Sequence, residues 1–550
     1  MVKLKKFSDN DQKSLFLAMV LVLIALFAVD WIFPSQKQMM QTPVQPVTVN
    51  EPIDADLPIT EPALTETELE QPTLAVRNNA VAGEMNLATG GLNSLSLLKY
   101  KETIEKDSPD VQLLNPTDYT TQLRWVSNNA QIPTTAGKWT INANELTPFE
   151  PVVIQLENND MRIEREIRLD NDYMFTVQDT IYNLKLTPIS VALNGQINRI
   201  LEKYPQLSGV HEGFVGVLDQ TLYEEKYADV SDDAFTKETT GGWMGITDKY
   251  WLTSFILDNN QPASVSFKHQ DKKYTASFTT TTQTIPVGGK ITQTTRLFAG
   301  AKELKLINAY QKELNIPRFD LAIDFGWFYF LTKPFLYFLY WLYAMVGNMG
   351  VAILIFATLL RIALLRTATK SYESMAKIRK IAPKINELKE RYGADKMRLQ
   401  QETMALYKRE KVNPAAGCLP LLIQIPVFFA LYKVLSVSIQ MRQAPFFGWI
   451  QDLSIPDPSS VFTLFGYLNW PVPSFLDIGI WPVLMGLTMY IQQKLNPAPT
   501  DKTQANMMKA LPIVFTFMLG QFASGLVIYW TWSNVLSIAQ QKYIMKKVGV

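Results

Sequence analysis

One residue of the sequence stands where its charge is chemically unusual: Arg361 lies within the apolar stretch 335–365. The other polar side chains of that stretch are Asn348, Thr358 and the edges of Tyr and Trp rings. An arginine at the centre of a membrane-spanning helix costs about 2.5–3.5 kcal/mol on insertion scales, so it normally faces a wet cavity or a partner. Two interpretations stay open from the residues alone: the side chain snorkels to lipid headgroups, or it lines a hydrated, positively charged site.

Residues for conventional catalysis are scarce. Cys418 is the single cysteine, which excludes an internal disulfide and a paired-cysteine metal or redox site. The two histidines, His211 and His269, lie far apart in a region of strand-like pattern, which is typical of ordinary surface or core roles. Residues 288–291, Gly-Gly-Lys-Ile, lack the Ser or Thr and the upstream glycine of a phosphate-binding loop. We expect no enzymatic activity, no metal site, no cofactor and no ATP-driven transport.

The charge distribution indicates a chain divided by a membrane. Of its 550 residues, 47% are apolar and only 19% are charged, which favours a membrane protein over a soluble one. Residues 30–330 carry a net charge of −14, whereas the remaining residues carry +15. Basic segments stay on the cytosolic side of a membrane, so this separation predicts that the acidic region lies outside.

The first 78 residues predict an anchor and a tether. Residues 1–33 combine a lysine-rich start with an apolar run from Leu15 to Val29, and bulky or charged residues follow where a cleaved signal peptide would need small ones. We therefore interpret this segment as a retained signal-anchor helix with a cytosolic N-terminus. Residues 34–78 are rich in Pro, Thr, Gln and Glu, which predicts a disordered linker.

Residues 79–318 have the alternating pattern of antiparallel strands. Residues 161–169 (MRIEREIRL) alternate between apolar and polar side chains, and Asn, Asp and Gly punctuate the runs. We expect a large β-sandwich outside the membrane, with a few helical stretches such as 301–314. A sugar-binding or sugar-converting cleft in this region is an alternative that the residues leave open.

The rest of the chain predicts further membrane segments. Residues 319–346 form an aromatic segment suited to the membrane interface, and residues 347–366 form a second transmembrane helix. Within residues 418–550 we expect four more spans, at Leu419–Val437, Ile478–Ile491, Leu511–Ala523 and Leu526–Ile544. The fold class predicted is a polytopic α-helical membrane protein with six transmembrane helices and both termini in the cytosol, plus the β-sandwich. Arg361 precedes Arg366 by five residues, so a continuous helix would place it about 7 Å deeper.

Residues 367–417 are basic and predict a cytosolic helical hairpin. An apolar stripe on the first helix runs from Met375 to Leu388, Tyr392-Gly393 makes the turn, and Met397, Met404 and Tyr407 begin the second helix. The opposite face of the first helix carries Lys377, Lys380, Lys384 and Arg391. This face is either simply solvated or a contact for ribosomal RNA or anionic lipid.

Six ordered blocks of sequence carry a resemblance to a known family. They are VNPAAGCLPLLIQIP at 412–426, YESMAKIR at 372–379, MALY at 404–407, RQAPF at 442–446, WPVLMGLTMYIQQK at 481–494 and SGLVIYWTWSN at 524–534. Together they resemble the YidC family of membrane protein insertases, and the preceding β-domain is similar to that of its Gram-negative branch. The sequence departs from the family pattern at three places. Arg366 and Ala523 each stand where the family commonly has proline, and the loop at about 461–478 is longer.

The resemblance implies a five-helix core with a positively charged groove that opens to the cytosol and the lipid. Arg361 falls on the groove arginine, and Gln424, Phe428 and Tyr529 fall on positions associated with the groove or the substrate path. It further implies an inner-membrane location with a periplasmic β-domain, and insertion, folding and assembly of membrane proteins without ATP hydrolysis. The implied partners are nascent membrane proteins, the Sec translocon, the ribosome through the cytosolic loops, and anionic lipids, but no DNA.

Three further interpretations belong with these expectations. Pro420 and Pro426 in one span are either tolerated kinks or a bend that shapes the groove mouth. A small-solute transporter or channel would use Arg361 as an anion site, although transporters usually show inverted repeats, which this sequence lacks. A periplasmic sugar enzyme on an anchor would instead be active in its β-domain alone.

Overall fold

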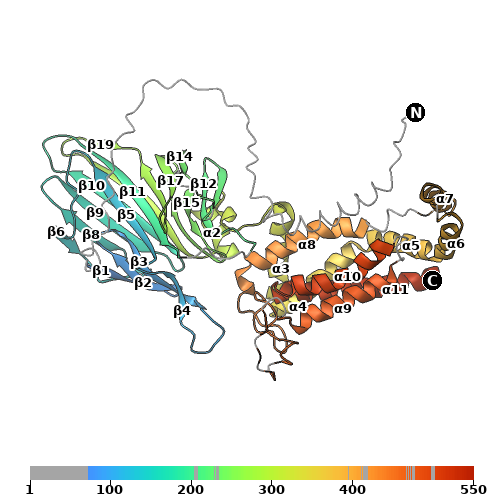
Figure 1. Cartoon of the computed structure of the whole chain (residues 1–550). Helices are drawn as coiled ribbons and strands as arrows, with labels where there is room; N and C mark the ends of the chain where they lie inside the picture. The colour runs from blue at the N-terminus through green and yellow to red at the C-terminus, as the bar shows by residue number, and fades with distance from the viewer. Residues whose placement is uncertain are drawn as a thin grey trace, which may run out of the picture.

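The structure is a computed structural model that describes residues 72–202, 209–227, 229–230, 235–393, 395–410, 412, 419–465, 467–468, 470, 472–473, 477–496 and 502–549. It contains a β-domain, built from strands β1–β20 with two short helices, and a helical part (Figure 1). The predicted N-terminal anchor and most of the predicted linker lie outside the described residues. The first strand, β1, covers Thr73–Arg77, so the linker prediction of 34–78 extends too far.

The largest sheet of the β-domain has nine strands in the order β13-β12-β15-β16-β20-β10-β9-β8-β6. All of its neighbouring strands pair antiparallel. Its members are β6 (Lys138–Ile141), β8 (Val152–Glu157), β9 (Met161–Leu169), β10 (Met174–Asn183), β12 (Gly213–Leu218), β13 (Thr221–Lys226), β15 (Trp243–Thr247), β16 (Trp251–Ile256) and β20 (Lys290–Ala301).

A second sheet faces the first and completes the sandwich. It runs β14-β17-β18-β11-β19, and β5 pairs with β11. Its strands are β5 (Tyr119–Ser127), β11 (Ile189–Ile200), β14 (Phe235–Thr240), β17 (Pro262–Gln270), β18 (Lys273–Thr280) and β19 (Gln283–Ile285). Buried side chains of both sheets, among them Phe214, Phe267 and Phe278, form one continuous hydrophobic core. The predicted antiparallel sandwich is therefore present.

A third, smaller sheet runs β4-β3-β2-β1-β7 along the side of the sandwich. It consists of β1, β2 (Val81–Asn86), β3 (Gly91–Lys101), β4 (Asp110–Leu114) and β7 (Glu145–Leu146). The pairing of β1 with β7 is parallel, the one departure from the antiparallel prediction among the described strand pairs.

The alternation predicted for residues 161–169 is confirmed in β9, whose odd-numbered residues point into the core. One of these inward residues is charged: Arg165 donates through Nε and Nη2 to the two carboxylate oxygens of Asp179, each at 2.7 Å. Trp125 Nε1 also donates to Asp179, at 2.7 Å. Arg165 Nη1 also donates to the carbonyl of Leu123 at 3.0 Å. Such additional hydrogen bonds offset part of the cost of burying an ion pair.

The β-domain ends in helix α2 (Leu304–Glu313) and the short turn η2 (Phe319–Ala322). The expectation of a helical stretch at 301–314 is confirmed. Phe319 is fully buried and packs edge-on against Trp243, so it belongs to the core of the β-domain. The predicted boundary between residues 318 and 319 is therefore wrong, because the chain leaves this core only after η2.

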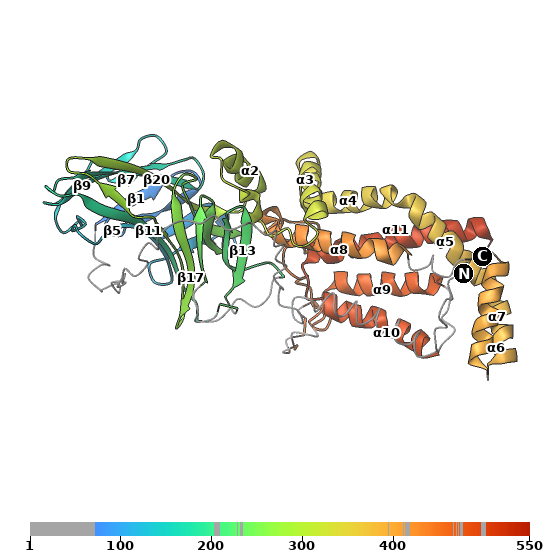
Figure 2. The same cartoon turned by 90° about the horizontal axis from the view of Figure 1, so that it is seen from above.

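The aromatic segment forms helix α3 (Tyr329–Val346), ten residues later than the predicted start at 319. Figure 2 shows that α3 lies across the direction of the neighbouring helices, at the end of the helical part nearest the β-domain. Trp327, Phe330 and Trp341 are exposed by 81%, 69% and 56%. Gly347, at φ 70°, ends α3 in the left-handed region that glycine readily adopts.

The remaining helices form a bundle whose long axis points toward the β-domain (Figures 1 and 2). They are α4 (Met349–Ala363), α5 (Leu365–Lys380), α8 (Leu419–Val437), α9 (Ile480–Leu495), α10 (Lys502–Leu519) and α11 (Ser524–Val548). The predicted division near Gln521 and Ser524 into two helices is confirmed, since α10 ends at Leu519 and α11 begins at Ser524. In the described residues no single helix passes the length and hydropathy test for a membrane span, whereas α4 and α5 pass it together, bent by 68°.

The basic segment differs from the predicted pair of helices. The expected first helix is divided at Ile381 into α5 and α6 (Ala382–Tyr392), and the hairpin partner of α6 is α7 (Lys396–Arg409). Pro383 at the start of α6 explains the division, because proline has no N–H and cannot continue the preceding helix. The hairpin core consists of Ile381, Ile385 and Leu406. Met397 and Met404 are exposed, so their predicted place in the apolar face is wrong.

Candidate functional site

Arg361 lies on the last turn of α4 and is directed at polar groups of two other helices. Its Nη2 donates to the hydroxyl of Tyr372 on α5, at 3.1 Å, and to Oγ of Ser537 on α11. Among the residues that the structure describes, none pairs with its buried Nε atom. The sequences of α4, α8 and α11 contain no Asp or Glu. The guanidinium is thus held by neutral hydroxyls of α5 and α11. Of the helices α4, α5, α8 and α11, only α5 contains an acid, Glu373.

The depth expected for Arg361 from Arg366 requires a correction. The estimate assumed one straight helix through both residues, but α4 ends at Ala363 and α5 begins at Leu365. Because the two helices are bent by 68°, five residues of helix rise do not measure the distance between the two side chains along the membrane normal. Arg366 is exposed, whereas Arg361 is partly buried.

Gln424, Phe428 and Tyr529 meet between α8 and α11. Nε2 of Gln424 donates to the hydroxyl of Tyr529 at 3.1 Å. Phe428, one helical turn after Gln424, packs against Trp530 with ring centroids 4.6 Å apart. Tyr529 is only 2% exposed. The resemblance named these three residues individually, and the structure brings them together at one contact of two helices.

The contacts of Arg361 and the contact of Gln424 lie on one face of α11. Tyr529 and Ser537 are eight positions apart, which is slightly more than two helical turns and about 12 Å of rise. Ser533 lies between them on the same face. Arg361 and Tyr372 therefore meet α11 about two turns from the place where Gln424 does, and the face between them combines a cation with hydroxyl and amide groups.

The sequence interpretation missed the polar residues that line α11. Asn534, Ser537 and Gln541 are buried, at spacings of three and four residues. Asn534 Nδ2 donates to Oγ1 of Thr488 on α9, and Gln541 Nε2 donates to Oδ1 of Asn496, both at 3.1 Å. The signal was present, because polar residues at helical spacing in an apolar helix indicate a shared inward face.

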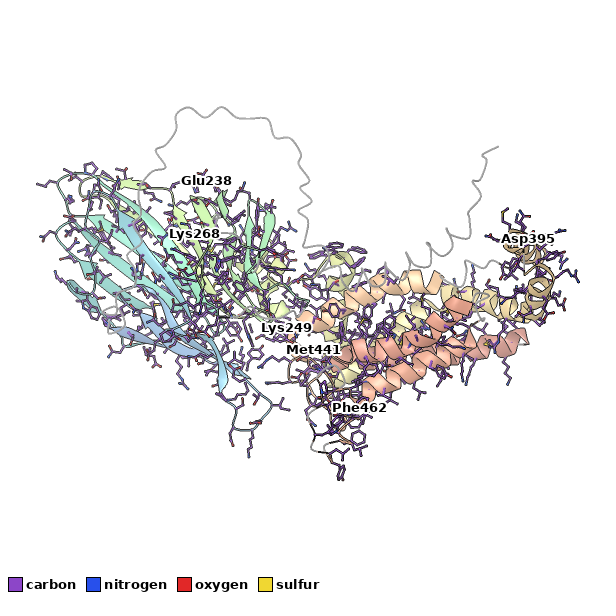
Figure 3. All side chains as sticks on the ribbon, viewed as in Figure 1. Glu238, Lys249, Lys268, Asp395, Met441 and Phe462 are labelled. Carbon is purple, nitrogen blue, oxygen red and sulfur yellow. The ribbon has the colours of Figure 1, made fainter. Side chains whose placement is uncertain are left out.

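The four basic residues predicted for one helix face belong to two helices. Lys377 and Lys380 lie near the end of α5, whereas Lys384 and Arg391 lie on α6. All four are exposed, and Lys384 forms an ion pair of 2.7 Å with Glu410. The single continuous face is therefore wrong, since the chain changes direction at Ile381. The hairpin lies at the end of the molecule away from the β-domain, where Figure 3 labels Asp395.

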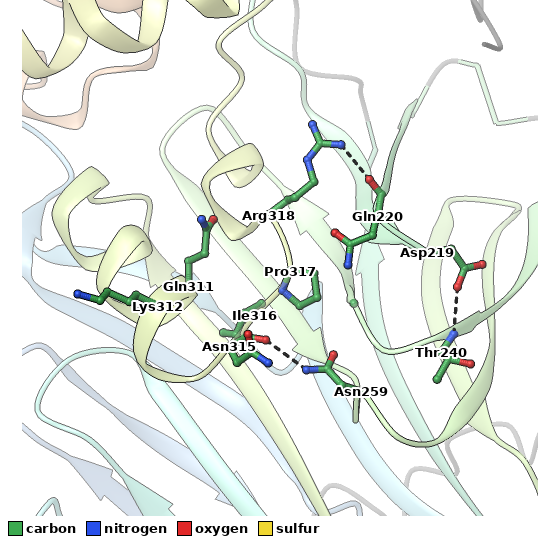
Figure 4. A pocket seen from close by; sticks show the side chains of 11 residues that line it. Asp219, Gln220, Thr240, Asn259, Gln311, Lys312, Asn315, Ile316, Pro317 and Arg318 are labelled. Atoms are coloured by element: carbon green, nitrogen blue, oxygen red, sulfur yellow. Dashed lines mark hydrogen bonds between the residues drawn. The ribbon is translucent and has the colours of Figure 1, made fainter. Parts of the chain in front are cut away.

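A hollow in the β-domain lies among the turns next to α2 and has a volume of about 610 Å³. Figure 4 shows polar side chains around it, including Asn259, Gln311 and Arg318. Arg318 Nη1 donates to the carbonyl of Gln220 at 2.8 Å, and Asn259 Nδ2 donates to that of Asn315 at 3.2 Å. The lining contains no aromatic side chain of the kind on which a sugar ring stacks.

The β-domain meets the bundle at a charged joint, formed by Gly209, His211, Asp324 and Lys433. Nζ of Lys433 on α8 lies 2.7 Å from Oδ2 of Asp324 and 2.7 Å from the carbonyl oxygen of Gly209. The main-chain N–H of His211 donates to the same Asp324 oxygen at 2.9 Å. Although burial opposes its charge, the Lys433 ammonium and these hydrogen bonds hold the pKa of Asp324 below its usual value. Burial lowers the pKa of His211 to about 4.

Comparison with known proteins decides the family. A profile described as "60Kd inner membrane protein" matches residues 341–549, and one described as "YidC periplasmic domain" matches residues 73–338. "Membrane protein insertase YidC" of Rickettsia bellii is 42% identical over 558 residues, covering 98% of this chain and 99% of the relative. The chain belongs to the YidC family. The Brucella suis protein of the same name is 45% identical over 499 residues, covering 88% of this chain and 82% of its own.

Members of the YidC family are inner-membrane proteins with a periplasmic domain, and this chain contains both parts. The predicted family is thereby confirmed. A solved structure titled "Active YidC insertase crystal structure with the first transmembrane domain resolved" covers 85% of this chain and 94% of its own, at 18% identity and a TM-score of 0.38. Arg361 and the contacts of Gln424 with Tyr529 fall in the part that matches the inner-membrane profile, whereas the polar hollow falls in the periplasmic part.

Proposed function

We propose that this YidC-family chain is a membrane protein insertase. It inserts inner-membrane proteins, and helps them fold and assemble, through a hydrated and positively charged groove that opens to the cytosol and the lipid. The observation that carries this proposal is the guanidinium of Arg361, which meets the hydroxyls of Tyr372 and Ser537 inside the bundle and leaves its buried Nε unpaired. A cation in this setting can attract an anionic group of an incoming chain.

The physical task of an insertase is to lower the cost of moving polar chain across lipid. Each backbone group left without a hydrogen bond in the hydrocarbon costs several kcal/mol. The hydroxyl of Ser537 beside the Arg361 cation, and the polar groups of Gln424 and Tyr529 about two turns away along α11, offer hydrogen bonds. A polar tail can therefore lose part of its water at smaller cost.

The free energy for insertion comes from the client itself, without ATP hydrolysis. Burial of an apolar helix in lipid gains about 0.8 kcal/mol per CH₂ group. The membrane potential adds about 2.3 kcal/mol per elementary charge per 100 mV, and it draws an acidic tail outward. The groove therefore needs to lower a barrier only, and it releases the client sideways into the lipid.

The partners follow from the same arrangement. Nascent membrane proteins are the clients, and the Sec translocon supplies some of them. With both termini in the cytosol and six transmembrane helices, the α6–α7 hairpin lies on the cytosolic side. Exposed Lys377 and Lys380 at the end of α5, together with Arg391 of the hairpin, suit the phosphates of ribosomal RNA or of anionic lipid. Lys384 contributes less, because Glu410 already neutralises it.

The test compares two clients that differ only in the charge of the translocated tail. In proteoliposomes with an imposed potential, Arg361→Ala should impair insertion of the client with the acidic tail more than that of the client with a neutral tail. The reason is that only the acidic tail loses an attractive charge. Protease protection of the tail measures insertion.

Arg366→Ala is the matched control, since it removes the same charge from an exposed position five residues away. It should leave the difference between the two clients unchanged, and Arg361→Lys should restore part of it. Equal losses for both clients with Arg361→Ala, at equal protein levels, would mean that the arginine is structural. Solute flux without insertion of either client would favour the transporter interpretation instead.

A further inference from the structure

The connection between α8 and α9 exposes several large apolar side chains next to one another in the sequence. They are Phe462 (40% exposed), Leu464 (53%), Phe465 (59%), Tyr467 (89%), Leu468 (47%) and Trp470 (48%), here called the outer loop tip. The surrounding segment 458–476 contains no Asp, Glu, Lys or Arg. A surface that faces water usually intersperses charge among its apolar groups, so this composition indicates a contact with something apolar.

The base of this connection is fixed to the bundle. The carboxylate of Asp457 accepts a hydrogen bond from the main-chain N–H of Trp481 at 2.9 Å, and Oγ of Ser459 accepts one from Ile480 at 3.0 Å. Both donors lie in the first turn of α9, where unpaired N–H groups are otherwise left. Ser524 at the start of α11 also donates to this connection, at 2.7 Å. The outer loop tip is thereby held beside the outer ends of α9 and α11.

The position of the outer loop tip relative to α3 indicates what the tip contacts. The connection and α3 protrude on opposite sides of the same end of the bundle in both views (Figures 1 and 2), and Figure 3 labels Phe462 at the edge of the connection. The exposed Phe330 and Trp341 of α3, and Trp327 just before it, are suited to the membrane interface. Aromatic side chains on two opposite sides at one level are the pattern of a belt around a membrane protein.

We propose that the outer loop tip is a second interfacial anchor, which enters the headgroup region of the outer leaflet opposite α3. The occupant of this surface is lipid. Protein interfaces normally surround an apolar centre with a polar and charged rim that fixes the register of the partner, whereas segment 458–476 has no charge. Tyr467 and Trp470 suit the boundary because each joins an apolar ring to a polar tip. Anchored on both sides, the bundle keeps its outer end level with the interface.

The test places one fluorescent label at a time in the full-length protein. Cys418, the single cysteine, is first replaced by serine. An environment-sensitive label is then attached at Leu464→Cys, in vesicles of phosphatidylethanolamine and phosphatidylglycerol. Phe330→Cys on α3 is the control for the interface, and Leu186→Cys, 92% exposed in a loop of the β-domain, is the control for water.

We expect the Leu464 label to emit at shorter wavelength than the Leu186 label. Lipid with a doxyl group near its headgroup should quench the Leu464 label severalfold more strongly than the Leu186 label. The Phe330 label should be quenched to the same extent as the Leu464 label. Tyr467→Cys provides the same measurement if the Leu464 variant does not reconstitute. A label that iodide quenches as strongly as at Leu186 overturns the proposal. A label shielded from both quenchers also overturns it, because a polypeptide then covers the outer loop tip.

Discussion

At the scale of single residues, the buried Arg165 and the partly buried Arg361 have different kinds of hydrogen-bond partner. Arg165 in the β-domain has a bidentate carboxylate partner in Asp179, whereas Arg361 in the bundle has the hydroxyls of Tyr372 and Ser537. A carboxylate cancels the charge, but hydroxyls only solvate it. Arg165 is therefore suited to holding a core together, whereas Arg361 keeps its positive charge, as the proposed groove requires.

The first of these roles gives a stability prediction. Asp179→Ala should lower the free energy of unfolding of the β-domain by about 3–5 kcal/mol, because it leaves the Arg165 guanidinium buried without its counter-charge. Lys138→Ala is the control: it breaks the exposed pair with Glu157, which water and salt screen, so it should change the free energy of unfolding far less. Denaturant unfolding of the full-length protein in detergent, followed through the β-sheet signal of circular dichroism, measures both. Equal losses of unfolding free energy in the two variants would contradict the role of the buried Arg165–Asp179 pair in holding the core together.

At the scale of elements, the sequence predicted best those elements whose pattern is local. Alternation in residues 161–169 identified β9, and the interruption at Gln521 divided α10 from α11. The same reasoning failed at Ile381, because the apolar spacing continues from α5 into α6 and conceals the change of direction. Pro383 was a signal for this break, since proline favours the first turn of a new helix.

The candidate site was predictable to a similar extent. The charge of Arg361 in an apolar stretch and the family resemblance led to Arg361, Gln424, Phe428 and Tyr529, but not to the hydroxyl partners of Arg361. Ser537 is 176 residues from Arg361 in the sequence, so only the packing of α11 against α4 brings them together. Tyr372 is nearer in sequence, but it meets Arg361 because the chain bends between α4 and α5. The hydrophobic periodicity of the sequence cannot predict such pairs, because they depend on how the helices pack.

The hairpin of α6 and α7 can be tested by two substitutions of similar size. Ile385→Ala removes a side chain from the hairpin core, where large-to-small changes cost about 2–5 kcal/mol. Met404→Ala removes one that is 46% exposed, and it should have little effect. Hydrogen exchange of the amides of α6 and α7 measures the opening of the hairpin. If Met404→Ala accelerates exchange as much as Ile385→Ala, the predicted apolar face, and not the observed one, is correct.

At the scale of the whole molecule, the charged joint connects the two parts that the family profiles divide. Asp324 follows the β-domain and Lys433 belongs to α8, 109 positions later, and the segment between them includes the basic hairpin. Val210 and Phe325 belong to the same apolar cluster as Leu431 and Val434 of α8, so the joint is apolar as well as charged. The sequence predicted both parts but not this contact, since each charge alone is typical of a solvated side chain.

The buried His211 makes the joint sensitive to acid. Its pKa is about 4 in the folded protein and about 6.5 when unfolded, mainly because burial disfavours the charged ring, while Lys302 and Lys226 act in the same direction and Asp324 against it. Below the unfolded pKa, the unfolded chain binds a proton that the folded chain does not, so stability falls as the pH decreases from about 6.5 to about 4.

The loss over this range is about 3 kcal/mol, from about 1.4 kcal/mol per pKa unit. His211→Gln should remove it, because Gln does not titrate and can still donate to the carbonyl of Phe214, which Nε2 of His211 contacts at 2.8 Å. The folded pKa of Asp324 is lowered, so its contribution to stability is lost as the unfolded carboxyl begins to protonate, from about pH 5 downward. Burial raises the pKa of Glu224 to about 7, so this group opposes the loss as the pH decreases. Both groups titrate in wild type and in His211→Gln alike, so the difference between the two proteins reports His211. Hydrogen exchange of the amides at 209–218, measured in both proteins across this range after correction for the intrinsic pH dependence of exchange, measures that difference. Identical pH dependence of wild type and His211→Gln above pH 4 would show that another group controls the joint.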